Sequence, residues 1–79
     1  MKFNKKFKLL CLNLGKHIQK IREEKGITIA EMSKRTGIRT QYLIKIEKGV
    51  ADGVLIDKHL SKIATALEIK LSKLFEFIS

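Results

Sequence analysis

The chain has 79 residues, one cysteine, no proline and a formal net charge of +9 at pH 7. A chain of this length forms at most one small domain, and a single cysteine excludes an internal disulfide. Thirteen basic and four acidic side chains lie in residues 1–48, so the whole positive excess falls there. Such an uneven charge indicates a polyanionic partner, which is DNA, RNA or an anionic membrane surface.

Residues 1–13 form a basic extension ahead of a domain expected over residues 14–79. An apolar run from Leu9 to Leu14 ends the extension, and Asn13 interrupts it. This run is shorter than the apolar region of a signal peptide, and no stretch approaches the roughly 20 apolar residues of a membrane span. We therefore expect a cytoplasmic protein whose residues 1–13 are either a flexible arm or the start of the first helix.

Glycines divide the rest of the chain into short amphipathic segments, as expected where a left-handed residue ends each helix. The first predicted helix carries Leu14, Ile18 and Ile21 on one face and ends at Gly26. Phe3, Phe7 and Leu10 continue the same stripe backwards, which is the argument for a helical extension.

The second predicted helix begins after Thr28, which forms a capping box with Glu31, and it ends before Gly37. The third spans about residues 40–48, the fourth starts near Asp57, and a short fifth helix closes the chain. No segment alternates apolar and polar residues as a half-buried strand would. The sequence therefore predicts an all-α fold.

Residues 29–49 have the features of two short helices joined by a tight turn. Gly37 suits a turn between helices that cross at a steep angle. Ser33 is small enough to let the helices approach, while Ile38 and Leu43 would hold the second helix on the first. A protruding, rigidly held helix is what entry into the major groove of DNA requires.

In order and spacing, these residues resemble the phage-repressor-type helix-turn-helix family, which contains lambda repressor and Cro (the XRE-like regulators). The resemblance covers the chain from Leu14 to about Phe75. Its marks are Leu14-Gly15-Lys16-His17-Ile18, Ile21-Arg22, Lys25-Gly26-Ile27-Thr28, Gly37-Ile38, Tyr42-Leu43, Ile46-Glu47-Lys48-Gly49, Ile63-Ala64-Thr65-Ala66-Leu67 and Leu74-Phe75. The resemblance implies a compact five-helix, lambda-repressor-like domain whose second and third helices dock on double-stranded DNA.

The same resemblance implies an ion pair between Arg22 on the first helix and Glu47 at the end of the third. A guanidinium fork can hold a carboxylate through two bonds, so the pair would tie the recognition helix to the rest of the domain. We expect this pair to be structural rather than a DNA contact.

By family position, the third helix reads base edges through Thr40, Gln41, Ile44 and Lys45. Gln bonds adenine, Lys bonds guanine, and an apolar group contacts the thymine methyl. Phosphate contacts are expected from Thr28, Lys34, Arg39, Tyr42 and Lys48. Tyr42 has a second interpretation, in which it packs half-buried on the second helix. The chain departs from the family at Ile29, where many relatives carry a phosphate-binding Gln.

Members of this family bind DNA as dimers that read half-sites about one helical turn apart. The C-terminal segment carries more apolar surface than one short helix buries internally, which favours an interface there. The residues expected in it are Leu71, Leu74, Phe75, Phe77 and Ile78. Phe3 and Phe7 are a second candidate interface.

The sequence thus predicts a sequence-specific transcriptional regulator that binds double-stranded DNA as a homodimer, and it favours a repressor over an activator. The alternative is an antitoxin-type module that binds a protein partner, a toxin or another regulator, and also autoregulates its promoter. A peripheral membrane role for the basic N-terminus ranks below both. His17, His59 and Cys11 lack metal-ligand spacing, and no cofactor, catalytic set or enzyme activity is expected.

Overall fold

The computed structural model describes residues 5–51 and 53–78, and for residues 53–57 it describes the backbone alone. This part of the chain forms four α-helices and one 3-10 helix, in the order α1 (Lys5–Glu24), α2 (Ile29–Thr36), α3 (Thr40–Glu47), α4 (Gly53–Ala66) and η1 (Leu71–Ile78). No strand occurs within these ranges. The all-α, five-helix fold predicted from the sequence is therefore confirmed.

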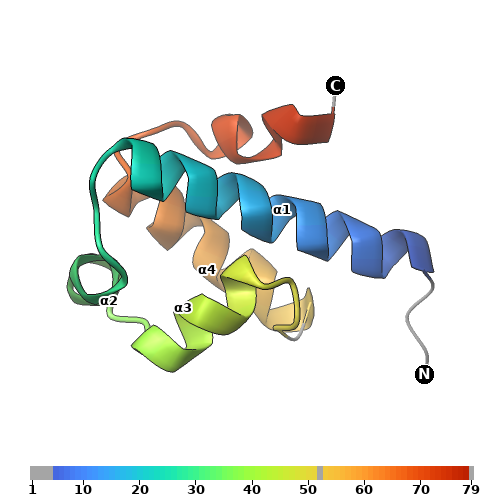
Figure 1. Cartoon of the computed structure of the whole chain (residues 1–79), viewed down its shortest axis with the longest axis horizontal. Coiled ribbons are helices and arrows are strands. Elements are labelled where there is room, and N and C mark those ends of the chain that lie inside the picture. Colours follow the sequence, from blue (N-terminus) through green and yellow to red (C-terminus); the bar gives the residue numbers. More distant parts are fainter. Residues whose placement is uncertain (1–4, 52, 79) are drawn as a thin grey trace.

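The longest helix, α1, crosses the whole molecule, with η1 on one side of it and α2 and α3 on the other, while α4 runs behind α3 and packs against both α2 and η1 (Figure 1). Its buried residues Leu14, Ile18 and Ile21 recur at intervals of three and four, which puts them on one face of the helix. Because α1 begins at Lys5, residues 5–13 are its first turns. Residues 1–4, Phe3 among them, lie outside the described part of the chain.

A single apolar core lies between the helices. Its largest side chains, each less than 2% exposed, are Ile18, Met32, Ile46, Ile63, Leu67 and Leu74. The half-buried Phe7 ring packs against this core, so part of its surface is used within the monomer. Every element contributes to the core, and no helix would keep its place alone.

Two elements differ from the sequence prediction. The helix α4 begins at Gly53, four residues before the expected cap at Asp57, whose side chain lies outside the described atoms. The last element is a 3-10 helix, which has three residues per turn and therefore aligns Leu71, Leu74 and Phe77. Of these, only Leu74 is completely buried, at 0% exposure.

This burial corrects one expectation about the dimer. Leu74 is part of the monomer core and is out of reach of a partner, while Phe75 and Phe77 pack half-buried against that core. Leu71 and Ile78 are 46% and 61% exposed, and they are the apolar side chains of η1 that remain at the surface.

Candidate nucleic-acid interface

The helix α2 starts at a side-chain cap. Thr28 has an extended backbone, and its Oγ1 accepts a hydrogen bond from the Glu31 amide at 3.0 Å. This is one half of the predicted capping box, because the Glu31 carboxylate accepts instead from Arg35 Nε at 3.1 Å. Arg35 Nη1 also donates to the Ala66 carbonyl at 2.9 Å, which ties α2 to the end of α4.

The turn between α2 and α3 is fixed by three polar groups. Gly37 has a positive φ of 76°, and its amide donates to the Ser33 carbonyl at 2.8 Å. Ser33 Oγ donates to the Ile38 carbonyl at 2.6 Å. Thr36 Oγ1 donates to the Met32 carbonyl at 2.7 Å and accepts from the Ile38 amide at 3.1 Å. The sequence indicated Gly37 and the small size of Ser33, but it did not reveal the hydroxyl bonds that set the angle of α3.

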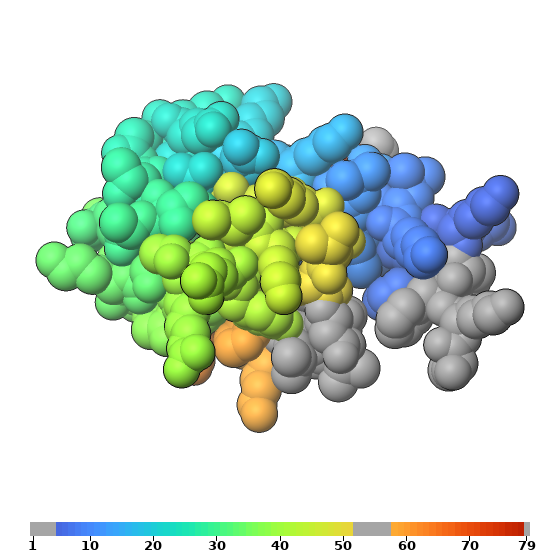
Figure 2. Space-filling model, turned by 60° about the horizontal axis from the view of Figure 1, so that its bottom comes forward, coloured from blue at the N-terminus to red at the C-terminus, as the bar shows by residue number. Residues whose placement is uncertain are grey.

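The helix α3 has one buried face and one exposed face. Leu43 and Ile46 are 2% and 1% exposed and hold it on the core. Its outward side chains, all exposed, are Thr40, Gln41, Ile44 and Lys45. Figure 2 shows α3 at the centre of one face of the molecule, between α2 and the first turns of α1. An isoleucine that is 40% exposed at the middle of such a face is available to contact a ligand.

The predicted phosphate-binding residues divide into two groups. The side chains of Thr28, Lys34, Arg39 and Lys48 are exposed around α2 and α3. Tyr42 is different, because its hydroxyl oxygen is buried and its ring meets His59 edge-on, with centroids 5.4 Å apart. The buried hydroxyl does not support a phosphate contact by Tyr42 in this conformation. The ring is half-buried, as the packing interpretation expects, but the ring contact that holds it is with His59 of α4. The ring forms part of a shallow hollow with Arg39, Gln41 and Lys45.

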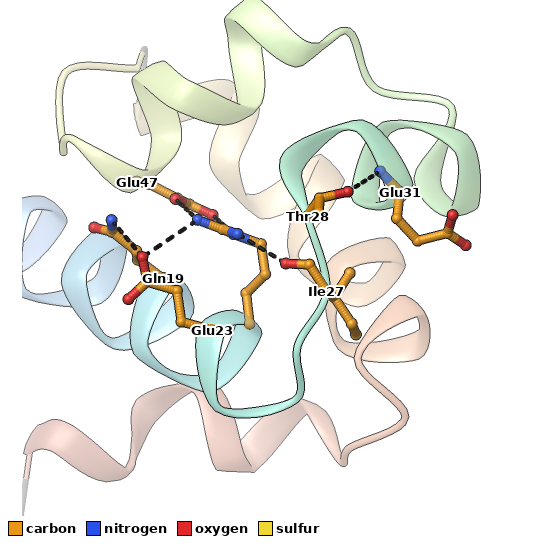
Figure 3. A network of polar contacts seen from close by, with 7 residues as sticks. Gln19, Glu23, Ile27, Thr28, Glu31 and Glu47 are labelled. Atoms are coloured by element: carbon orange, nitrogen blue, oxygen red, sulfur yellow. Dashed lines mark hydrogen bonds and ion pairs between the residues drawn. The ribbon is translucent and has the colours of Figure 1, made fainter.

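The Arg22 guanidinium joins three parts of the fold. It donates to the Glu47 carboxylate from Nε at 2.7 Å and from Nη2 at 3.1 Å, and its Nη1 donates to the Ile27 carbonyl at 2.8 Å. Figure 3 shows these bonds linking Glu47 at the end of α3 with Ile27 ahead of α2. Both side chains are buried, and the hydrogen bond that Arg22 donates to Glu47 raises the pKa of Arg22. The pair that the resemblance implies is thus present, and both charges face each other rather than a ligand.

Two glycines, Gly15 and Gly49, bring α1 against the end of α3, and the sequence analysis missed this close approach. A Cβ on Gly15 would lie 2.5 Å from the Glu47 carbonyl oxygen and would also clash with that of Ile46. A Cβ on Gly49, which has a φ of 76°, would lie 2.5 Å from Leu12 Cα. The signal available in the sequence was a glycine inside an apolar helical stripe, which often marks a close backbone approach.

Other chemistry finds little support in the residues that the structure describes. No group of three His, Cys, Asp or Glu side chains there is placed to hold a metal ion. His17 Nε2 lies 3.0 Å from the Lys73 carbonyl, so this ring contacts the backbone of η1. Burial raises the pKa of the Cys11 thiol, which favours its neutral form. Among the described helices, none combines the length and the apolar character needed to cross a membrane.

Comparison with known proteins identifies the family. Residues 17–79 match the Cro/C1-type HTH DNA-binding domain. The chain belongs to this family. The chain is 33% identical over 63 residues to the HTH-type transcriptional regulator SlrR of Bacillus subtilis (strain 168), a match that covers 80% of this chain and 41% of SlrR. It is 27% identical over 63 residues to the regulator SinR of the same organism, covering 80% of this chain and 56% of SinR.

This Cro/C1-type domain therefore spans about half the length of the curated relatives it matches. Among solved structures, it is similar to the restriction-modification controller protein C.AhdI from Aeromonas hydrophila. The TM-score is 0.74 at 26% identity, over 82% of this chain and 96% of that one. The clp gene regulator ClgR from C. glutamicum shares the fold, with a TM-score of 0.76 at 23% identity over 84% of this chain and 83% of that one.

Proposed function

We propose that this chain is a sequence-specific regulator of transcription that inserts α3 into the major groove of duplex DNA and acts as a repressor. The observation that carries the proposal is the two-sided character of α3. Its inner face and its C-terminal end are fixed by burial, by the Arg22–Glu47 pair and by two glycine contacts, while its outer face is free of partners within the core. A helix held in this way loses little conformational freedom on binding.

The outer face of α3 carries the chemistry to read bases. Gln41 would bond an adenine edge through its amide, and Lys45 would reach guanine. Ile44 and the Thr40 methyl would contact thymine methyl groups. Their exposed side chains are the basis for these assignments.

Phosphate contacts would surround this reading face. Arg39 precedes α3, Lys48 follows it, and Lys34 lies on α2. Thr28 Oγ1 already accepts the Glu31 amide, which leaves the hydroxyl proton for a phosphate oxygen. These contacts position the protein, and the base contacts give the specificity.

The regulator is proposed to act as a homodimer in the cytoplasm, as a binding protein without catalytic activity. Leu71 and Ile78 are the exposed apolar side chains of η1 that support an interface there. The names of the relatives, which are transcriptional regulators, support the regulatory role.

The test is the selection of bound duplexes from a random library, followed by titration of the selected duplex with Gln41→Ala and Lys45→Ala. Each variant should weaken binding to the selected duplex by about tenfold or more and relax the preference at one base pair. Lys70→Ala, which removes an exposed lysine next to η1, is the control and should bind normally. If no selected duplex binds better than random DNA at physiological salt, specific regulation is wrong.

A further inference from the structure

The first turns of α1 carry lysines that are not among the base-contacting and phosphate-contacting residues proposed above. Lys5 and Lys8 are exposed and three residues apart, so they lie on one face of the helix. The chain has no acidic residue before Glu23, and their own helix therefore supplies no nearby carboxylate to neutralise them. A solvated lysine face remains a site for an external anion.

This lysine face of α1 lies next to the end of α3. Lys8 lies one helical turn before Leu12, whose backbone packs against Gly49, the second residue after α3. Figure 2 shows the first turns of α1 beside the end of α3, on the face at whose centre α3 lies. Lys45 and Lys48 are exposed at that end of α3, so positive charge continues from α3 onto α1.

The length of this surface fits the DNA backbone. At 1.5 Å per residue, Lys5 lies roughly 10 Å along the helix axis from the Leu12 contact. That distance corresponds to about three nucleotides of one strand, at 3.4 Å per step of duplex. A lysine binds phosphate as a flexible point charge and does not require a preformed pocket.

We propose that Lys5 and Lys8 form a second phosphate-binding site, which contacts the DNA backbone about three base pairs beyond the last contact of α3. This inference rests on the proposed function, because it requires α3 to be seated in the duplex. The site adds affinity on any sequence, and it lengthens the stretch of DNA that one domain protects.

The test measures the affinity of the full chain for the selected duplex and for a random duplex as salt is varied. In Lys5→Gln/Lys8→Gln, the slope of log K against log salt should fall by about 1.8, since each phosphate contact contributes roughly 0.9. The affinity should drop by the same factor on both duplexes. Shortening the duplex by three base pairs on the flank beside α1 should weaken the wild type but leave the double variant unaffected.

The matched control is Lys6→Gln/Lys20→Gln, which removes the same charge from exposed positions of the same helix. At about 100° per residue, Lys6 projects nearly opposite to Lys8 and roughly at a right angle to Lys5, away from the side of α1 that meets α3. This control should keep the wild-type slope. Equal slopes in the two double variants, with wild-type binding intact, would overturn the second site alone. A wild-type chain that binds no duplex would overturn the proposed function together with it. Thermal unfolding of each variant is the control for folding.

Discussion

Arg22 and Glu47 meet in the interior of the domain, where each would be costly to bury alone. Taking an ion out of water costs several kcal/mol, and the partner charge offsets this only when hydrogen bonds complete the geometry. Here the carboxylate receives two guanidinium donors, and a third donor reaches the Ile27 carbonyl. The pair therefore fixes where α3 ends relative to α1, and a change in either residue should act through stability.

We expect Glu47→Leu to lower the free energy of unfolding by about 3–5 kcal/mol, because it removes two hydrogen bonds from a buried guanidinium and leaves it with the exposed Glu23 carboxylate, 3.9 Å away. The variant Arg22→Met/Glu47→Leu should lose less than the sum of the single changes, with a coupling energy of about 1–3 kcal/mol. Urea unfolding of the four proteins in the cycle measures this. Strictly additive losses would show that the two side chains do not stabilise each other.

Individual residues were predictable where the sequence pattern alone fixes their direction. Leu43 and Ile46 follow helical periodicity and are buried as expected. Tyr42 kept two interpretations because its ring packs against His59 of α4, a residue 17 positions away that no local pattern connects to it. Leu74 was misassigned for a related reason, since its burial depends on where η1 packs.

At the level of elements, the positions of glycine predicted where helices end. Gly26, Gly37 and Gly49 have positive φ values and follow the helices that the sequence places before them. The start of α4 was missed because a favourable cap residue, Asp57, lies inside a helix that begins at Gly53. The 3-10 form of η1 depends on its packing against α1 and α4, and a short apolar segment gives no signal for it.

Alanine at Gly15 and at Gly26 should separate steric from conformational roles. Gly26→Ala should cost about 1 kcal/mol, because its φ is 70° and open space surrounds it. Gly15→Ala should cost more, about 2 kcal/mol or above, because the new methyl group meets the carbonyl oxygens of Ile46 and Glu47. Thermal and urea unfolding provide the comparison. An equal or smaller loss at Gly15 would mean that α3 can move away from α1 freely.

For the whole molecule, the basic excess and the exposed apolar side chains of η1 lie on different parts. The basic excess falls in residues 1–48, which contain α2, α3 and the basic face of α1, while residues 49–79 are neutral overall. The helix η1 lies across α1 from α3 (Figure 1). This separation would let one surface bind DNA while another meets a second copy of the chain.

We therefore expect Leu71→Ser/Ile78→Ser to weaken self-association in sedimentation velocity, because these side chains are 46% and 61% exposed and would lose their apolar contacts. Binding to a palindromic duplex should weaken, and binding to a single half-site should not change. Leu9→Ser, at another exposed leucine, is the control. A double variant that associates as the wild type does would place the interface elsewhere.

The close seating of α1 against α3 also has a consequence for how such a protein diversifies. Four residues fix the position of α3 against α1, and each is sensitive to substitution: Gly15, Gly49, Arg22 and Glu47. The outward side chains of α3 are exposed, so their mutation is expected to cost little stability. New operator preferences are therefore accessible by single changes on one side of a helix, without a loss of folding that later mutations would have to repair.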